Sequence, residues 1–367
     1  MFSYLFSIIV FILVLGFLIF IHEFAHFLSA KLSKVRVDEF GFGLPPKIWG
    51  KKKGETEYTI NALPIGGFVR LAGEDSEEVS SDPRDFSAQA PWKRALMVAA
   101  GVAANFLLAV FVFTTIYTIG GPIESNKVVI GNVEKNSPAA LAGLKEEDLI
   151  TAIDGRQLEG RDDFQRKVKD QLGKDLTLTI EREKVVKEVK LKPRKDPPAG
   201  QGPIGIGLLP YVETKAYPIW ESPIVGTEQT FKMAGTMIDG LRGMLRDLVV
   251  KKEVPEGVGG VVRIGYLTHI ATQAGPISVL MLLGLLSLNL AIINILPLPA
   301  LDGGRLVFIL IEFVTKKRVP LRFEKWIHAA GMVLIILLVV LITYQDLIWL
   351  WFNTSLGEKL HHLIPFS

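Results

Sequence analysis

Long uncharged runs alternate with charged segments along this chain, and each run is long enough to cross a membrane. A helix of roughly 20 apolar residues spans about 30 Å of hydrocarbon. The pattern therefore predicts four transmembrane helices. The first run could instead be a cleaved signal peptide, but no basic residue precedes it and no small-residue cleavage site follows it. The four runs, of which only the last contains a charge (Asp346), are Met1–Ile21, Ala95–Ile123, Ala271–Leu301 and Ala329–Leu356.

The basic residues between these spans predict the orientation of the chain. Short cytoplasmic segments are enriched in Lys and Arg. Both termini and the long segment from about Glu124 to Ile270 are then expected outside. The basic residues are Lys31, Lys34, Arg36, Lys51, Lys52, Lys53, Lys93 and Arg94 between spans one and two, and Lys316, Lys317, Arg318, Arg322 and Lys325 between spans three and four.

A small sheet is predicted between the first two spans. Aromatic and aliphatic residues recur there, separated by Pro45-Pro46, a Lys/Gly turn at 51–54 and Pro64-Ile65-Gly66. We expect it to dip into the cytoplasmic face of the membrane, with a solvated hairpin as the alternative. The predicted strands are Val37–Gly43, Lys47–Trp49, Glu57–Ala62 and Gly67–Leu71.

The outer segment is predicted to begin with a small α/β domain. A helix should start at Asn136-Ser137-Pro138 and end at Gly143, and a second should cover Asp162–Gln171. The predicted strands are Val128–Val133, Leu149–Ile153, Asp175–Ile180 and Val185–Leu191. From Ile224 to Val249, apolar residues then recur with helical spacing, which predicts an amphipathic helix on the outer leaflet or packed on the small domain.

Composition narrows the class of protein. Hydrophobic residues make up 49% and charged residues 22% of the 367 residues, with a net charge of +3. The mean hydropathy of +0.34 excludes a disordered chain, a fibrous repeat and an ordinary soluble enzyme. The small net charge gives no sign of nucleic-acid binding. With no cysteine, a metal site must be built from His, Asp and Glu.

The first span ends in a metal-binding pattern. In His22-Glu23-Phe24-Ala25-His26, the two histidines lie at i and i+4, so both imidazoles share one helix face and can bind one Zn²⁺. Glu23 is placed to take a proton from the attacking water. The alternative, two histidines that only mark a helix end, is disfavoured because ionisable groups within a span are costly and usually functional.

A third ligand must lie at the same membrane depth. Asp302 meets this condition because spans one and three both run inward, and Pro297, Pro299 and the following Gly303-Gly304 permit a break and close backbone approach. It could instead cap the next helix. His328 is the second choice for this ligand, and Glu39 and Glu312 remain open. The remaining candidates are expected too far out: His269, Asp346, His361 and His362.

The motifs H-E-F-A-H at 22–26 and N-I-L-P-L-P-A-L-D-G-G at 294–304 resemble the site-2 protease family of intramembrane zinc metalloproteases, most closely the bacterial RseP/RasP group. The likeness extends over essentially the whole chain. Ser137–Gly155 is similar to part of a bacterial PDZ domain. The family's G-P-x-x-N pattern in span two is present with Val102 for Pro, between Gly101 and Asn105. Asn105 could instead form a hydrogen bond between helices.

This resemblance implies a zinc metalloendopeptidase of the bacterial plasma (inner) membrane that cleaves single-span membrane proteins, such as anti-sigma factors, or signal-peptide remnants. It implies that His22, His26 and Asp302 bind zinc and that Glu23 is the base. It further implies that Asn294 and Pro297 shape the substrate site. The Asn294 amide could bind a substrate carbonyl or the developing oxyanion, or satisfy backbone groups freed by Pro297.

The expected architecture is a polytopic helical membrane protein with a small membrane-associated sheet and one extracytoplasmic PDZ-like α/β domain. Its active site is expected near the cytoplasmic side. The predicted segments are span one at 1–30, the β-rich segment at 31–92, span two at 93–120, the PDZ-like domain at 121–212, the amphipathic helix and membrane-proximal segment at 213–270, span three at 271–312, a cytoplasmic loop at 313–326, span four at 327–356 and a tail at 357–367.

Substrate binding is expected at the β-rich segment. A substrate helix must unwind before cleavage, and its freed backbone needs partners in lipid. An edge strand at Gly66–Leu71, including Gly67 and Phe68, could pair with it. The PDZ-like domain could bind a newly exposed C-terminus or exclude substrates with large outer domains. Two other functions, a membrane scaffold and a metal transporter, explain the clustered His22, Glu23 and His26 less well.

Overall fold

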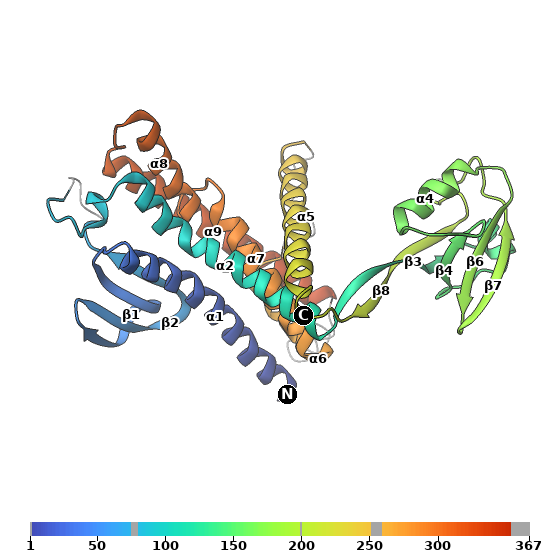
Figure 1. Ribbon diagram of the computed structural model, residues 1–367, viewed down its shortest axis with the longest axis horizontal. Coiled ribbons are helices and arrows are strands. Elements are labelled where there is room, and N and C mark those ends of the chain that lie inside the picture. The colour runs from blue at the N-terminus through green and yellow to red at the C-terminus, as the bar shows by residue number, and fades with distance from the viewer. Residues whose placement is uncertain (1, 75–79, 199, 251–258, 354–367) are drawn as a thin grey trace, which may run out of the picture. The chain divides into compact units, whose positions relative to one another are not determined.

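The computed structural model describes residues 2–74, 80–198, 200–250 and 259–353. The chain divides into two compact units, one formed by Met1–Ile116 with Pro218–Ser367 and the other by Tyr117–Tyr217. Figure 1 shows the first unit as a group of long helices beside a small sheet, and the second as an α/β unit. His361 and His362 lie outside the described residues.

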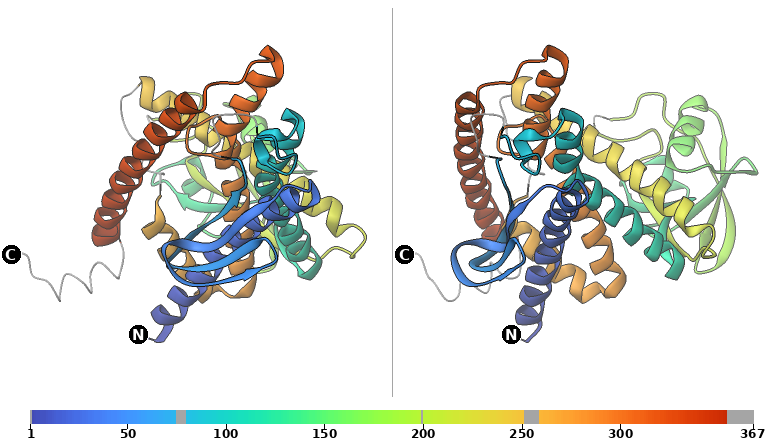
Figure 2. Two further views of the ribbon diagram at one scale, coloured as in Figure 1. Left: turned by 90° about the vertical axis from the view of Figure 1, so that its left-hand side faces the viewer. Right: turned by 60° about the vertical axis from the view of Figure 1, so that its left-hand side comes forward.

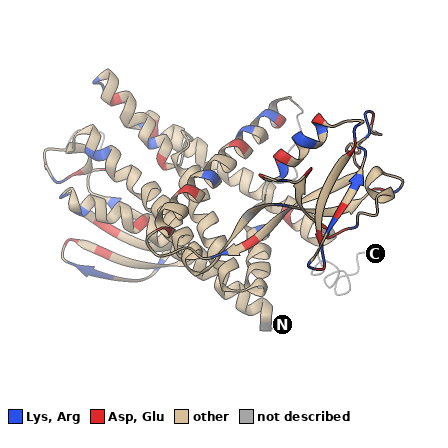
Figure 3. Cartoon of the chain, turned by 45° about the vertical axis from the view of Figure 1, so that its right-hand side comes forward, with Lys and Arg blue, Asp and Glu red and all other residues tan. Residues whose placement is uncertain are grey.

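Four helices are long and apolar enough to cross a membrane: α1 (Phe2–Leu32), α2 (Pro91–Ile119), α7 (Pro276–Ile295) and α9 (Leu321–Asn353). Figure 3 shows long stretches without charge along helices of the first unit, whereas the α/β unit carries charges of both signs. This is the separation of apolar from charged residues that the sequence predicts. The other helices of this unit are η1 (Phe86–Ala88), α5 (Ser222–Val250), α6 (Val261–Ala274) and α8 (Asp302–Thr315).

The segment 271–312 is not one helix. Helix α6 ends at Ala274, and α7 begins after Gly275, whose φ of 111° leaves the helical region. Helix α7 ends at Ile295, and α8 starts at Asp302. The turn at 296–301 contains both prolines, each of which lacks a backbone N–H and disfavours helix in the residue before it. The chain can therefore place a turn and a new helix N-terminus beside the first span.

The small sheet of the first unit consists of β1 (Val37–Lys53) and β2 (Thr56–Leu71), which fold back on themselves. Residues 39–42 pair with 57–60 on one side and with 67–70 on the other, while 47–53 pair with 56–61. The order across the sheet is therefore 47–53, 56–61, 39–42, 67–71. Within the described chain, 67–71 is an edge with one free side. Figure 2 shows this sheet against α1.

Packing of this sheet on α1 is aromatic and aliphatic. The Phe27 ring centroid lies 5.2 Å from that of Phe40 and 6.0 Å from that of Tyr58. Buried Ala30, Val35, Val37 and Met97 join α1, the sheet and α2 in one small core. The edge strand is consequently held on a rigid base close to the end of the first span.

The second unit is an antiparallel sheet with the order β7-β6-β4-β3-β8, in which β5 also pairs with β4. Its core includes Ile130, Ile150, Phe164, Leu178 and Ile180. The helix start predicted at Asn136-Ser137-Pro138 is confirmed, and the Ser137 hydroxyl caps α3 by accepting from the Ala140 N–H. The elements are β3 (Gly121–Val133), α3 (Pro138–Leu141), β4 (Leu149–Ile153), β5 (Arg156–Gln157), α4 (Arg161–Asp170), β6 (Leu176–Arg182), β7 (Val185–Leu191) and β8 (Ile206–Lys215).

A buried ion pair stabilises the second unit. The fully buried Asp148 carboxylate accepts from Arg182 Nε and Nη2, at 2.6 Å each. Burial alone would raise the pKa of Asp148, but the Arg182 guanidinium holds that pKa below its ordinary value. The pair therefore stabilises this unit at neutral pH, and its contribution is lost as the pH falls below about 4.

Candidate active site

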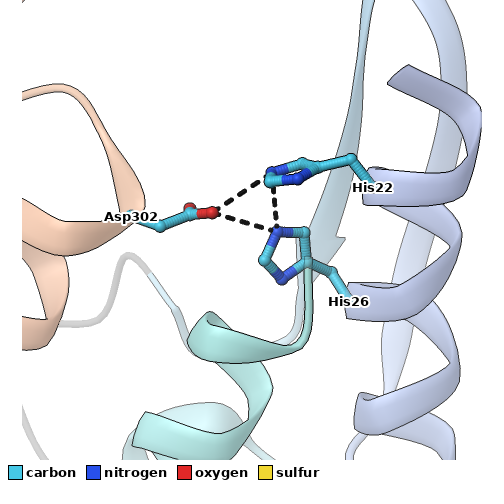
Figure 4. Close-up of side chains that lie close together, drawn as sticks. All are labelled: His22, His26 and Asp302. Atoms are coloured by element: carbon cyan, nitrogen blue, oxygen red, sulfur yellow. Dashed lines mark hydrogen bonds and ion pairs between the residues drawn. The ribbon is translucent and has the colours of Figure 1, made fainter. Parts of the chain in front are cut away.

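The two motif histidines lie on one face of α1. Figure 4 shows both imidazoles pointing away from the helix toward the carboxylate of Asp302. The i, i+4 spacing puts the second ring one turn beyond the first, and the two Nε2 atoms are 3.2 Å apart. His22 is buried, and His26 is partly buried. The helix thus presents two imidazole lone pairs at one point.

Asp302 reaches these histidines because of the turn that precedes α8. Gly303 and Gly304 pack directly against the backbone of this turn. A Cβ on Gly303 would lie 2.1 Å from Leu296 O, and a Cβ on Gly304 would lie 2.4 Å from Leu298 O. Ala300 has a φ of 71°, a left-handed conformation that costs a non-glycine residue roughly 1–2 kcal/mol. Its N–H donates to His328 Nδ1 at 2.8 Å. The turn is therefore tightly built, and its last residue leads to Asp302.

The three groups fit a zinc ion. Asp302 Oδ2 lies 3.1 Å from His22 Nε2 and 3.4 Å from His26 Nε2. Ligand atoms of a tetrahedral zinc at about 2.0–2.1 Å from the metal are about 3.3–3.4 Å apart. Asp302 Oδ2 is buried and has no hydrogen-bond partner within the described chain, as expected for an atom that bonds a metal. Across the described residues, no other group of three His, Asp or Glu side chains forms such a cluster.

Helix α2 supports both histidines through residues on one stripe. His26 Nδ1 lies 2.8 Å from the carbonyl oxygen of Met97, and His22 Nδ1 lies 3.1 Å from the side-chain amide of Asn105. A histidine that binds metal through Nε2 carries its proton on Nδ1. Nδ1 of His26 therefore donates to Met97 O. Because amide O and N are interchangeable by a flip, we assign the Asn105 oxygen as acceptor from His22.

Gly101 lies between these two supports and comes closest to the metal ligands. A Cβ at this position would lie 2.3 Å from His26 Nε2 and 2.8 Å from His22 Nε2. Only glycine lets α2 approach so closely. Met97, Gly101 and Asn105 are spaced by four residues each, so α2 aligns them on one face. This geometry gives Gly101 and Asn105 of the second span a physical role that the sequence left open.

Glu23 faces a cavity of about 590 Å³ that also contacts all three clustered side chains. The edge strand of β2 borders this cavity through Gly67, Phe68, Val69 and Leu71. A Cβ on Gly67 would lie 2.9 Å from Glu23 Cγ. The edge strand therefore runs directly past the predicted base.

Of the other residues predicted to bind substrate, some line the site and one does not. Asn294 and Gly66 line a cavity of about 250 Å³ together with His22, Glu23 and Asp302. Pro297 lies in the turn between α7 and α8 and lines neither of these two cavities. The structure thus brings Asn294, Gly66, Gly67 and Phe68 to the site and gives Pro297 a place in shaping the turn.

The remaining ligand candidates are used elsewhere. His328 Nδ1 accepts from the Ala300 N–H, and Glu39 pairs with Arg70. Glu312 pairs with Arg94 and Arg318. At the other end of the spans, His269 bonds Ser7, and the buried Asp346 accepts from the N–H groups of Gly260 and Arg263 at the start of α6. His328 as the third ligand is therefore disfavoured.

Comparisons with known proteins agree with this site. The profile of peptidase family M50 matches residues 10–338. The chain belongs to peptidase family M50. It is 34% identical to a Clostridium perfringens protein that is named as a zinc metalloprotease. The match covers 90% of this chain and 96% of that protein. It is 30% identical over 93% of its length to the zinc metalloprotease RasP of Geobacillus kaustophilus, 97% of which is covered.

Solved structures are similar to part of the chain. The PDZ domain of the SdrC-like protein from Listeria monocytogenes is 24% identical, with a TM-score of 0.22, and the match covers 24% of this chain and 92% of that domain.

Membership of family M50 makes the protein a zinc metalloprotease, as the sequence motifs predict, and the four apolar helices make it a multi-pass membrane protein.

Proposed function

We propose that the protein is an intramembrane protease of the bacterial plasma membrane that cleaves single-span membrane proteins in or near their transmembrane segments. His22, His26 and Asp302 hold the zinc, and Glu23 is the general base. The observation that carries this proposal is the meeting of three ligand atoms within 4.8 Å of one another, from two distant segments, beside a carboxylate in a cavity. A scaffold would need no such arrangement, and a transporter would need ligands at several depths.

The bound zinc would supply a Lewis acid that polarises the scissile carbonyl and lowers the pKa of water. The residues of the chain do the rest. The Glu23 carboxylate takes a proton from the attacking water and passes it to the leaving nitrogen. Asn294, which lines the same small cavity as Glu23, donates to the substrate carbonyl as its oxygen gains charge.

Substrate binds as an added strand along residues 67–71. This edge pairs on one side with residues 39–42 and borders the Glu23 cavity. An unwound substrate segment would gain backbone hydrogen bonds there that lipid cannot provide. Gly67 has no side chain, so this edge strand lies directly against Glu23. Signal-peptide remnants and single-span regulators such as anti-sigma factors fit this mode equally.

The basic segments between spans one and two and between spans three and four lie in the cytoplasm. The termini and the PDZ-like unit are then extracytoplasmic, and the active site lies near the cytoplasmic side. The exposed residues Ile224, Phe231, Ile238 and Leu245 recur every seven residues along α5 and contact the outer leaflet. The PDZ-like unit either gates access or contacts a substrate peptide.

Three forms of the purified full-length protein test this function. Wild type, Glu23→Gln and Asp302→Ala are mixed in detergent with a tagged single-span substrate, and bound zinc is measured in each. Wild type should cleave, Glu23→Gln should keep zinc and lose at least about a hundredfold in rate, and Asp302→Ala should lose zinc. Cleavage by Glu23→Gln, or zinc retained by Asp302→Ala, would contradict the assigned roles.

A further inference from the structure

The fourth span contacts the turn that leads to Asp302 at two points on one helix face. His328 Nδ1 accepts from the Ala300 N–H at 2.8 Å. Three residues further along α9, Gly331 packs so closely that a Cβ would lie 2.3 Å from Pro299 Cβ and 2.8 Å from Pro299 C. Residues three apart in a helix share a face. One side of α9 therefore lies against the two residues at the centre of this turn.

This contact is made to a residue with a strained backbone conformation. Ala300 is held at a φ of 71°, a conformation that a non-glycine residue adopts only when its surroundings impose it. Asp302 follows two residues later. If Ala300 relaxed toward ordinary φ values, the chain direction would change immediately before the carboxylate that meets His22 and His26.

The acceptor role also fixes the state of the His328 ring. A ring nitrogen that accepts a hydrogen bond has a free lone pair, so the proton of the neutral ring sits on Nε2. Nε2 lies 3.9 Å from a carboxylate oxygen of Glu324, one turn earlier in the same helix. His328 is thus oriented with one nitrogen toward the turn and the other toward Glu324.

We propose that His328 is a positioning residue for zinc binding: through Ala300 it holds the turn that places Asp302, and Gly331 lets α9 approach closely enough for this contact. The assignment rests on the proposed ligand role of Asp302. It links the docking of the fourth span to the affinity of the site for its metal, although α9 contributes no ligand.

A matched pair of variants isolates the hydrogen bond. Asn and Leu have nearly the same shape, and Asn Oδ1 occupies the position of His Nδ1 on Cγ, so His328→Asn keeps an acceptor that His328→Leu lacks. The zinc dissociation constant of each full-length protein is measured by competition with a chelator, together with its melting temperature. We expect His328→Leu to bind zinc at least about tenfold more weakly than wild type, and His328→Asn to stay within about threefold.

Gly331→Ala provides a second test that does not depend on the ring. Alanine favours helix over glycine, so a loss of zinc affinity cannot come from a weaker α9. Gly265→Ala in α6, where a Cβ meets nothing within 4 Å, is the matched control and should leave zinc affinity unchanged. Gly331→Ala should weaken zinc binding, because the added Cβ would displace Pro299 or α9.

Equal zinc affinity in His328→Leu and His328→Asn, or wild-type affinity in Gly331→Ala, would overturn the inference. A lower melting temperature without a change in zinc affinity would likewise show a purely structural contact. If Asp302→Ala also keeps its zinc, the proposed ligand set fails instead, so the two failures can be told apart.

Discussion

The buried amide of Asn105 controls how one zinc ligand is presented. Its side chain is fully buried and contacts His22 Nδ1, and its main-chain oxygen accepts from the Ser287 hydroxyl at 2.7 Å. A ring whose Nδ1–H has no acceptor loses both its orientation and part of its basicity. The second span therefore orients the two histidines with the Asn105 side-chain amide and the Met97 backbone carbonyl, neither of which is a proposed metal ligand.

We expect Asn105→Leu, which keeps the shape of the side chain, to lower zinc affinity or activity by about 10- to 100-fold. Zinc affinity is measured by chelator competition. Ser287→Ala is the control, because it removes a hydrogen bond to the Asn105 backbone and leaves the amide in place. Zinc binding at the wild-type level in Asn105→Leu would show that Asn105 only joins two helices.

The edge strand of β2 is the element on which substrate binding depends. Proline removes a backbone donor, and successive N–H groups in a strand point to opposite sides. Only one of the two neighbours Phe68 and Val69 therefore has its N–H on the free side of the strand. Proline at that position should abolish cleavage and retain zinc. Lys52→Pro at the opposite edge of the sheet is the control and should remain active. Cleavage and zinc content are measured together, and full activity in both edge-strand variants would exclude strand addition.

Elements that depend on local sequence could be predicted closely. The predicted strands Leu149–Ile153 and Val185–Leu191 have the bounds of β4 and β7. The four short strands predicted between 37 and 71 fall within two long strands, β1 and β2, whose two halves pair with different neighbours. The i, i+4 histidines and the prolines before Asp302 likewise predicted which side chains meet.

The supports of the site could not be predicted in this way. Met97 contributes only a backbone carbonyl, which every residue has, so no side-chain pattern marks it. His328 was identified as a candidate by its membrane depth, but its contact with Ala300 depends on how α9 packs. Such roles arise from tertiary contacts between distant helices rather than from spacing within one helix.

At the scale of the whole molecule, the α/β unit is an insertion whose ends meet. The Tyr217 N–H donates to the carbonyl oxygen of Tyr117 at 2.8 Å, and Gly121 pairs with Lys215. A unit with adjacent ends can be removed without stretching the rest of the chain. The first unit contains all of the proposed catalytic residues.

Replacing residues 122–212 by a short Gly/Ser linker should therefore leave zinc binding intact. If the unit is a gate, the shortened protein should also cleave substrates with large outer domains that wild type rejects. We expect this broader range, measured against a series of substrates with outer domains of increasing size. Loss of all cleavage would instead indicate that the unit recognises substrates, and an unchanged substrate range would exclude both roles.

The lack of a side chain at Gly101 has a consequence for how relatives of this protein are classified. A methyl group there would enter the space between the two Nε2 atoms. We expect a homologue with the histidines, the glutamate and the aspartate all present, but with alanine at this position, to be a pseudoenzyme, because the methyl group would displace the metal-binding rings. A survey that counts only the residues of the two motifs would score it as active.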